Sequence, residues 1–287
     1  MDPRPLICVW PRATRAVSVT GTECALNCAH CGRRYLAGMA DLRTVGLEPV
    51  EAGQEEGRSW RRIKSLLVSG GCDRRGVVPL AREAGRLRRL RRRFRLNAHP
   101  GLVEEAEAEA LAGWADVASL DFVADADTLR EVYGLEAGPE RFVAALRALR
   151  ARLPVVPHLC LGLRGGGLGP EGAALDRLVA EGVDALVVLV FIPTPGTRYA
   201  GRSAPPVEEV AAFLSAARKR LPGARLTLGC MRPGGRYREA LDVAAVEAGV
   251  DAIVQPAPAA RRLAAAQGRA LVPYDECCAF LSASGNP

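Results

Sequence analysis

The stretch Ser18-Val19-Thr20-Gly21-Thr22-Glu23-Cys24-Ala25-Leu26-Asn27-Cys28-Ala29-His30-Cys31 places three cysteines on one short loop. The loop directly follows an alternating run, residues 16–20, of the kind that forms a β-strand. Three thiolates at this spacing can each bind one iron of a cubane cluster. A zinc ion or a fully ligated cluster needs a fourth ligand nearby, and the side chain of His30 points away from that of the adjacent Cys31. The pattern favours a [4Fe–4S] cluster with one open iron, with zinc or a structural cysteine cluster as the alternative.

The bulk composition is that of a globular protein. The 287 residues are 49% hydrophobic and 25% charged, which suffices for one α/β barrel. No run approaches 18 apolar residues, and Pro3, Pro5 and Pro11 interrupt the region where a signal peptide has its apolar core. Nine cysteines, three of them in a motif that requires thiolates, fit a reducing compartment. We therefore expect a cytoplasmic protein without a membrane partner.

The net charge of +7 comes almost wholly from arginine. Its densest run, residues 86–95, spaces Leu87 and Leu90 three apart, as on one face of a helix. We interpret this run as a solvated helix face; an acidic protein partner is the alternative, and nucleic acid is not expected as a partner.

Short apolar runs alternate with longer helical patterns along the chain, which is typical of βα units and a parallel sheet. We expect a single domain over residues 1–287 that forms a (β/α)₈ TIM-type barrel, with an open, partial (β/α)₆ barrel as the alternative. Residues 268–287 are expected to form a C-terminal tail that caps the barrel mouth. The predicted strands are Ala16–Thr20, Ser65–Ser69, Arg95–Ala98, Val117–Phe122, Val155–Leu161, Ala185–Phe191, Arg225–Leu228 and Ala252–Gln255.

In such a barrel the chemistry gathers where the strands end. Gly70-Gly71, after the second predicted strand, permits a close backbone approach to a zwitterionic ligand. Asp121 is a candidate ligand for a ribose or a substrate, or else caps its strand end. His99 and His158 either make buried hydrogen bonds or handle substrate and protons.

Further cysteines fall near the same predicted edge. Cys72 and Cys230 follow strand ends, and Cys277 and Cys278 lie in the tail. Four thiols that converge there would form a second cluster site; isolated functional thiols and inert thiols are the alternatives. Cys8 and Cys160 lie within apolar runs and are expected to be small buried hydrophobic residues.

The three-cysteine loop resembles the signature of the radical S-adenosylmethionine superfamily, whose open iron binds the amino and carboxylate groups of S-adenosylmethionine. An aromatic residue usually precedes the last cysteine, where this chain has His30. The segment Ser69–Asp73 resembles the superfamily's glycine-glycine-acid motif, with Cys72 in place of the acid. The resemblance implies that S-adenosylmethionine is bound by Ser69, Gly70, Gly71, Asp121, Gly162, Phe191, Ile192 and Pro193.

The segments Ser18–Cys31, Ser69–Asp73 and Gly229–Pro233 together resemble the biotin-synthase-like branch, which includes a subunit of the two-component, archaeal-type lipoyl synthase. The resemblance implies that the reduced cluster cleaves S-adenosylmethionine to methionine and a 5′-deoxyadenosyl radical, and that this radical removes hydrogen from an octanoyl chain on a carrier lysine. Sulfur from an auxiliary [4Fe–4S] cluster would then be inserted, a sulfurtransferase reaction. The candidate catalytic residues are Cys230, Asp121 and His99; the candidate auxiliary ligands are Cys72, Cys230, Cys277 and Cys278.

The same resemblance implies three partners: an electron donor such as ferredoxin or flavodoxin, a lipoyl carrier protein or octanoyl-lysyl peptide, and a second radical S-adenosylmethionine subunit. Two other functions stay open. One is a radical S-adenosylmethionine enzyme of cofactor biosynthesis without sulfur insertion, and the other is a non-enzymatic zinc or iron–sulfur electron-transfer protein.

Overall fold

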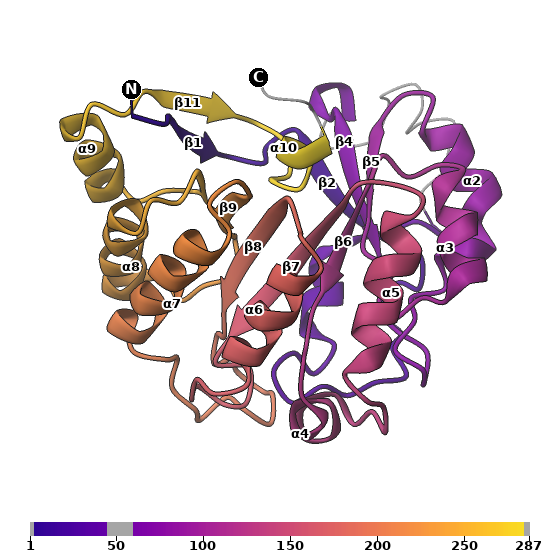
Figure 1. Ribbon diagram of the computed structural model, residues 1–287. Helices are drawn as coiled ribbons and strands as arrows, with labels where there is room; N and C mark the ends of the chain where they lie inside the picture. Colours follow the sequence, from indigo (N-terminus) through magenta and orange to yellow (C-terminus); the bar gives the residue numbers. More distant parts are fainter. Residues whose placement is uncertain (1–2, 45–59, 284–287) are drawn as a thin grey trace.

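The computed structural model describes residues 3–44 and 60–283, in which eleven parallel strands form one curved sheet with helices on its outer side (Figure 1). The strand order is β11-β1-β10-β9-β8-β7-β6-β5-β4-β2-β3. The strands are Leu6–Val9 (β1), Thr14–Ser18 (β2), Ala40–Asp41 (β3), Ser65–Ser69 (β4), Arg95–Ala98 (β5), Val117–Asp121 (β6), Val155–Leu161 (β7), Ala185–Val190 (β8), Arg225–Leu228 (β9), Ala252–Val254 (β10) and Leu271–Tyr274 (β11).

The predicted α/β barrel is confirmed. The eight predicted strands correspond to β2 and β4 to β10, and they neighbour one another in chain order. Four of them, β4, β5, β7 and β9, have the predicted bounds. Within the described residues β3 and β11 are the two edges and do not pair, so the sheet is a curled, open barrel.

Helices connect the strands and bury one apolar face each. In α2 this face includes Leu87 and Leu90, both fully buried, which confirms the helix expected from their spacing. The helices are Ala84–Leu90 (α2), Glu105–Ala112 (α3), Ala126–Thr128 (α4), Glu140–Arg150 (α5), Glu171–Ala180 (α6), Val207–Arg220 (α7), Gly235–Glu247 (α8), Pro258–Ala266 (α9) and Phe280–Ala283 (α10). Shorter turns are Arg34–Gly38 (η1), Trp60–Arg62 (η2), Leu80–Glu83 (η3) and the π-helical turn Leu129–Tyr133 (η4).

The C-terminal segment closes the end of the barrel at which the strands begin. The Cys277 backbone N–H donates to Thr14 Oγ1 (2.7 Å), and Glu276 pairs with Arg95 (3.2 Å); Thr14 and Arg95 are the first residues of β2 and β5. Figure 1 shows α10 beside β1 and β11 at the top, opposite α4, which follows the end of β6.

The sequence predicted that residues 268–287 cap the mouth of the barrel, whereas in the structure the C-terminal segment closes the opposite end. The physical reason is apolar burial inside the barrel. Phe280 and Leu281 join Ile7, Val117 and Val156 from the inner face of the sheet in one buried cluster. Residues 284–287 lie outside the described part of the chain.

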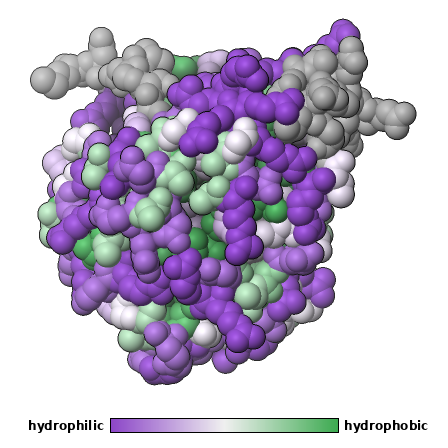
Figure 2. Space-filling model, turned by 90° about the vertical axis from the view of Figure 1, so that its right-hand side faces the viewer, coloured by the Kyte–Doolittle hydropathy of each residue, from purple (hydrophilic) through white to green (hydrophobic). Residues whose placement is uncertain are grey.

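The described surface is mostly hydrophilic. Figure 2 shows one face on which hydrophilic side chains surround small hydrophobic areas. On the described surface, the exposed large apolar side chains are those of Tyr35 and Leu271. In residues 3–44 and 60–283, no helix has the length and apolar character that crossing a membrane requires.

Candidate active site

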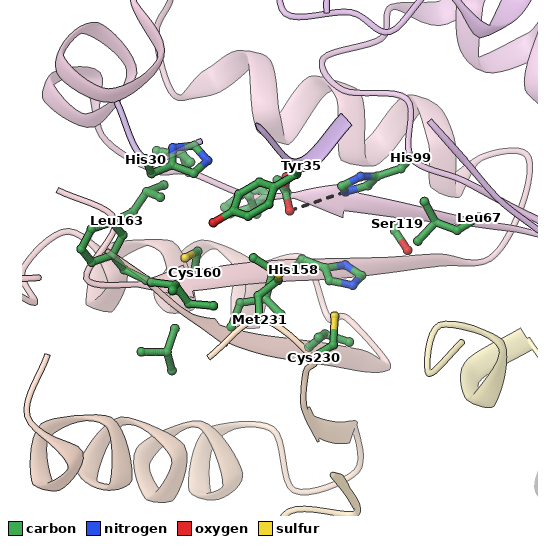
Figure 3. Close-up of a pocket in the computed structure, with 18 of the residues that line it drawn as sticks. His30, Tyr35, Leu67, His99, Ser119, His158, Cys160, Leu163, Cys230 and Met231 are labelled. Carbon is green, nitrogen blue, oxygen red and sulfur yellow. Dashed lines mark ion pairs between the residues drawn. The ribbon is translucent and has the colours of Figure 1, made fainter. Parts of the chain in front are cut away.

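A cavity of about 400 Å³ lies inside the barrel. Successive side chains of a strand point to opposite faces of the sheet, so on β7 His158 and Cys160 face the cavity (Figure 3). Leu159 and Leu161, between and after them, are buried on the opposite face. Cys160, which the sequence analysis expected to be buried among apolar residues, is thus a wall residue, whereas Cys8 is buried as expected. Further lining side chains come from β2, β4, β6 and β8, from the segments that follow β5 and β9, and from the C-terminal segment.

The three-cysteine loop begins where β2 ends and is held by its own polar residues. The Ser18 hydroxyl donates to the Gly21 carbonyl (2.7 Å), and the Thr20 hydroxyl donates to the Glu23 carbonyl (2.9 Å). Gly21 has φ +59°, a conformation that favours glycine. The turn therefore depends on residues that the sequence places directly before Cys24.

The loop packs on the glycine pair that follows β4. The Gly71 N–H donates to Thr20 Oγ1 (2.7 Å), and the Ala25 N–H donates to the Cys72 carbonyl (2.8 Å). A Cβ added at Gly71 would lie 1.9 Å from the Glu23 oxygen and 2.5 Å from Cys24 Cβ. Glycine is required at position 71 because the backbone of the cysteine loop occupies the space of a side chain.

The loop thiols lie near one another with different exposure. Cys28 is buried, and Cys24 and Cys31 are half-buried. The Cys28 thiol hydrogen-bonds to the Cys31 sulfur, which lowers the pKa of Cys31 to about 7 and raises that of Cys28. Among the described residues no three His, Cys, Asp or Glu side chains are placed to hold one metal ion. A cubane gives each cysteine its own iron, so the three gathered thiols fit that group.

His30 does not complete a metal site with these cysteines. It lines the cavity, and its ring packs edge-on against Tyr133 with centroids 5.6 Å apart. Burial lowers the pKa of His30 to about 4, so the ring is neutral at pH 7. The Nδ1 atom of His30 is buried and has no hydrogen-bond partner among the described residues. His30 is therefore a neutral side chain on the wall of the cavity.

Cys72 and Asp73 take different roles beside the glycine pair. Asp73 accepts hydrogen bonds from the backbone N–H groups of Arg75 (2.8 Å) and Val77 (3.0 Å), so its carboxylate is used within its own turn. Burial raises the pKa of Cys72 to about 12, and the nearby Cys24 adds to this effect. Cys72 thus lies with the three-cysteine loop, because the end of β4 packs on that loop.

His99 and Asp121 form a charged pair on the cavity wall. His99 Nε2 lies 3.5 Å from Asp121 Oδ1. Burial opposes both charges, but the pair overcomes it: His99 lowers the pKa of Asp121 to about 2, and Asp121 raises the pKa of His99 above its ordinary value. The Asp121 side chain remains 50% exposed, and Asp121 lines the cavity.

His158 is neutral, and its ring centroid lies 5.9 Å from that of His99. Burial, and then the charge of His99, lower the pKa of His158 to about 4. Its Nδ1 lies 3.0 Å from the Val156 carbonyl oxygen, which can only accept, so Nδ1 carries the proton. His158 Nε2 is then a hydrogen-bond acceptor on the wall of the cavity.

Three thiols gather at the closed end of the cavity: Cys230, which follows β9, and Cys277 and Cys278, which precede α10. We call these three residues the floor thiols. Hydrogen bonding from Cys278 lowers the pKa of Cys277 to about 7, and burial raises that of Cys230. The structure therefore brings together three of the four candidate auxiliary ligands and places Cys72 with the other group.

The remaining predicted ligands are divided between the cavity and the scaffold. Phe191 and Ile192 line the cavity, whereas Ser69 donates to the His99 carbonyl (3.1 Å) and joins the ends of β4 and β5. Gly162 has φ +72°, and its N–H donates to the buried Glu171 carboxylate (2.8 Å). Ser69 and Gly162 thus hold strand ends; Gly70 and Pro193 are not among the lining residues.

Arg232 and Asp242 fix the loop that carries Cys230, a role the sequence analysis missed. Both side chains are fully buried and pair at 2.8 Å. Arg232 also donates to the carbonyls of Gly229 (2.5 Å) and Val254 (2.8 Å), which joins the ends of β9 and β10. An arginine four residues after β9 and an aspartate in α8 gave no local pattern from which this pairing could be predicted.

Comparisons with known proteins concern the fold. No family model matches the sequence, and no curated protein sequence matches it. Among solved structures, methylornithine synthase (PylB) is similar with a TM-score of 0.61 and 16% identity, over 88% of this chain and 72% of that chain. The FeFe-hydrogenase maturase HydG from Carboxydothermus hydrogenoformans has a TM-score of 0.57 and 17% identity, over 87% of this chain and 58% of that one.

Streptococcus suis SuiB, solved bound to S-adenosylmethionine, has a TM-score of 0.53 and 14% identity, over 83% of this chain and 52% of that chain. This chain therefore spans little more than half the length of HydG and SuiB. At these identities the likeness concerns architecture. The chain has the parallel, partial α/β barrel fold of PylB, HydG and SuiB.

Proposed function

We propose that this chain is a radical S-adenosylmethionine enzyme that inserts sulfur into an unactivated C–H bond of a protein-bound octanoyl chain, as a subunit of lipoyl synthase type. One juxtaposition carries the proposal. A three-cysteine loop lies at the C-terminal ends of the strands, and a largely apolar cavity runs from His30 in that loop to three thiols at its closed end. SuiB, which shares the fold, was solved with S-adenosylmethionine bound.

Cys24, Cys28 and Cys31 would hold the cluster, with Gly71 fixing the loop against β4. When bound and reduced, the cluster and S-adenosylmethionine supply the radical chemistry that removes hydrogen from an unactivated carbon. The residues of the chain orient the reactants and exclude water. Leu67, Val187 and Leu189 provide an apolar wall suited to an alkyl chain.

The polar wall residues have defined proton states. Asp121 is ionised and His99 protonated when they pair, so this pair can hold a polar group of substrate or cofactor. His158 offers an acceptor at Nε2. These assignments follow from the contacts with Asp121 and Val156.

Sulfur insertion, in place of another radical reaction, rests on the floor thiols. A reaction that only rearranges carbon has no use for Cys230, Cys277 and Cys278 at the end of the substrate cavity. The branch resemblance implies an auxiliary [4Fe–4S] cluster as the source of the sulfur. A radical S-adenosylmethionine enzyme of cofactor biosynthesis without sulfur insertion is the alternative.

The proposal includes partners of three kinds: an electron donor such as ferredoxin or flavodoxin, a lipoyl carrier domain bearing an octanoyl-lysine, and a second radical S-adenosylmethionine subunit. The branch resemblance suggests that two subunits share the two insertions. The carrier delivers its acyl chain through the mouth, because the C-terminal segment closes the opposite end.

The test is an anaerobic incubation of the reconstituted chain with S-adenosylmethionine, dithionite and an octanoyl-lysyl carrier peptide, with and without a candidate partner subunit. We expect 5′-deoxyadenosine, methionine and a peptide whose mass has increased by one sulfur atom. Cys28→Ala should reduce cleavage to background, whereas Cys8→Ala, in a buried strand outside the cavity, should retain it. Cleavage without sulfur addition would favour the alternative reaction, and no cleavage would refute both.

A further inference from the structure

Among the floor thiols, Cys277 is held in place by hydrogen bonds to its sulfur and to its backbone. The Asn97 side-chain N–H donates to Cys277 Sγ (3.6 Å), and the Ser119 hydroxyl donates to Asn97 Oδ1 (3.1 Å). The Ser119 contact fixes the orientation of the amide, so its N–H group is the one directed at sulfur. The backbone N–H of Cys277 donates to Thr14, which fixes the main chain as well. The Cys277 sulfur therefore has a fixed position beside a hydrogen-bond donor.

This arrangement suits a sulfur atom that carries negative charge. A side-chain amide donates to an anionic sulfur more strongly than to a neutral thiol. Among the described cavity thiols, Cys277 is the one that accepts such a side-chain amide hydrogen bond. It also lines the cavity of about 400 Å³, which leaves room beside it for one more sulfur atom.

We propose that Cys277 carries a transferable sulfur atom as a persulfide at the floor of the cavity. The inference deepens the proposed function and rests on it for the fate of that sulfur. The substrate carbon radical takes the outer sulfur as the S–S bond at Cys277 breaks, and the thiyl radical left on Cys277 is reduced to the thiolate by one electron from the ferredoxin- or flavodoxin-type donor. It replaces the auxiliary cluster as the sulfur source and names the atom to which the sulfur is attached.

The loading step transfers one sulfur atom from a donor to Cys277 and involves no net oxidation or reduction. The Cys277 thiolate attacks the outer sulfur of a persulfide or polysulfide donor. A new S–S bond forms at Cys277, the S–S bond of the donor breaks, and the inner donor sulfur leaves as a thiolate. The proton lost by Cys277 goes to that leaving group. Asn97 stabilises the anionic persulfide by its N–H group, and Cys278 and Cys230 lie nearby as the thiols to which the sulfur could pass.

The experiment uses the full 287-residue chain after anaerobic cluster reconstitution, with sodium tetrasulfide as the sulfur donor. The protein is desalted, alkylated and cleaved with trypsin. Cleavage after Arg269 releases Cys277 and Cys278 in one peptide, apart from Cys230 and Cys160, and fragmentation distinguishes the two adjacent residues. We expect an added sulfur atom on Cys277. Cys277→Ser should abolish the addition on this peptide.

Asn97→Asp tests the hydrogen bond while nearly keeping the size of the side chain. It replaces the donor with an anion, and we expect persulfide at Cys277 to decrease several-fold. The control Cys8→Ala, in β1 away from the cavity lining, should load like the parent chain. Equal loading of Asn97→Asp would refute the role of Asn97. Sulfur found chiefly on Cys230 or Cys160, or none on a Cys277 that still reacts with iodoacetamide, would overturn the assignment.

Iron analysis separates the persulfide from an auxiliary cluster. We expect about four irons per chain, and the same content in Cys277→Ser. About eight irons, falling to about four in Cys277→Ser, would show a cluster ligand and refute the persulfide. Loading requires no S-adenosylmethionine. Loading without S-adenosylmethionine cleavage would therefore refute the proposed function, whereas cleavage without loading would refute this inference alone.

Discussion

Asp121 determines which histidine of the cavity wall is charged. His99 follows β5 and His158 lies in β7, on either side of β6, and both are enclosed. The pKa of His99 is nevertheless raised, and that of His158 is lowered to about 4. The difference follows from geometry: His99 Nε2 lies 3.5 Å from the Asp121 carboxylate, whereas the His158 Nδ1 proton is directed at the Val156 carbonyl. The wall therefore presents one ion pair and one neutral acceptor.

Asp121→Asn should reverse the direction of the His99 shift. Without the carboxylate, burial is the larger effect, and we expect the pKa of His99 to fall below its ordinary value of about 6.5. In the parent chain the stabilisation by the pair is fully present between about pH 4 and 6.5. It is lost as the pH rises through the pKa of His99 or falls toward that of Asp121.

NMR titration of the imidazole signals measures this directly, because the chain has three histidines. His30 and His158 are the internal controls, and their low pKa values should persist in the variant. A His99 pKa that does not move in Asp121→Asn would show that the two side chains do not form an ion pair in solution.

Single residues were predicted from the sequence where the pattern is local, and missed where the partner is distant. The spacing of Cys24, Cys28 and Cys31 is contained in eight positions, and these thiols do lie near one another. The grouping of Cys72 with Cys24, and of Cys230 with Cys277, depends on contacts across about fifty residues in each case. Such contacts are set by strand order and by the path of the C-terminal segment.

Strands were predicted well where both faces are covered. The buried runs of β4, β7 and β9 are bounded by turn residues, and their bounds agree with the prediction. The strands β1, β3 and β11 were not predicted from the sequence. β11 has Pro273 in its interior and exposed residues at alternate positions, so local propensity argues against a strand. It forms because Leu271 to Tyr274 pair with Leu6 to Val9.

The contact between the cysteine loop and the end of β4 can be tested with Gly71→Ala. The added Cβ would overlap the Glu23 carbonyl oxygen and the Cys24 Cβ, so the loop must move. We expect a loss of about 1–3 kcal/mol in the free energy of unfolding, by urea titration, and less iron bound after reconstitution.

Gly85→Ala is the matched control. Gly85 lies within α2, where an added Cβ meets nothing within 4 Å. Alanine at this position should stabilise the chain by about 0.5–1 kcal/mol and leave the iron content unchanged. If Gly71→Ala behaved like Gly85→Ala, the loop would not pack on the glycine pair as the structure has it.

At the scale of the whole molecule, the two ends of the barrel differ: one end carries the cysteine loop, and the C-terminal segment closes the other. The cysteine loop and the glycine pair lie where the strands end, and the C-terminal segment lies where they begin. Phe280 is fully buried among residues of the inner sheet face, with the Arg95 guanidinium over its ring (4.4 Å to the centroid). The last described residues of the chain therefore close the floor of the cavity, where Cys277 and Cys278 join Cys230.

Phe280→Ala should destabilise the barrel more than an exposed substitution in the same region. Removing a buried phenyl ring from a packed core costs about 3–5 kcal/mol. Leu271→Ala, at a side chain that is 40% exposed on β11, should cost about 1 kcal/mol or less. Urea unfolding of both variants gives the comparison, and iodoacetamide labelling of Cys277 and Cys278 should accelerate in Phe280→Ala alone, because the closure over these thiols is weakened. Similar losses of stability and similar labelling rates in the two variants would mean that the C-terminal segment does not close the barrel in solution.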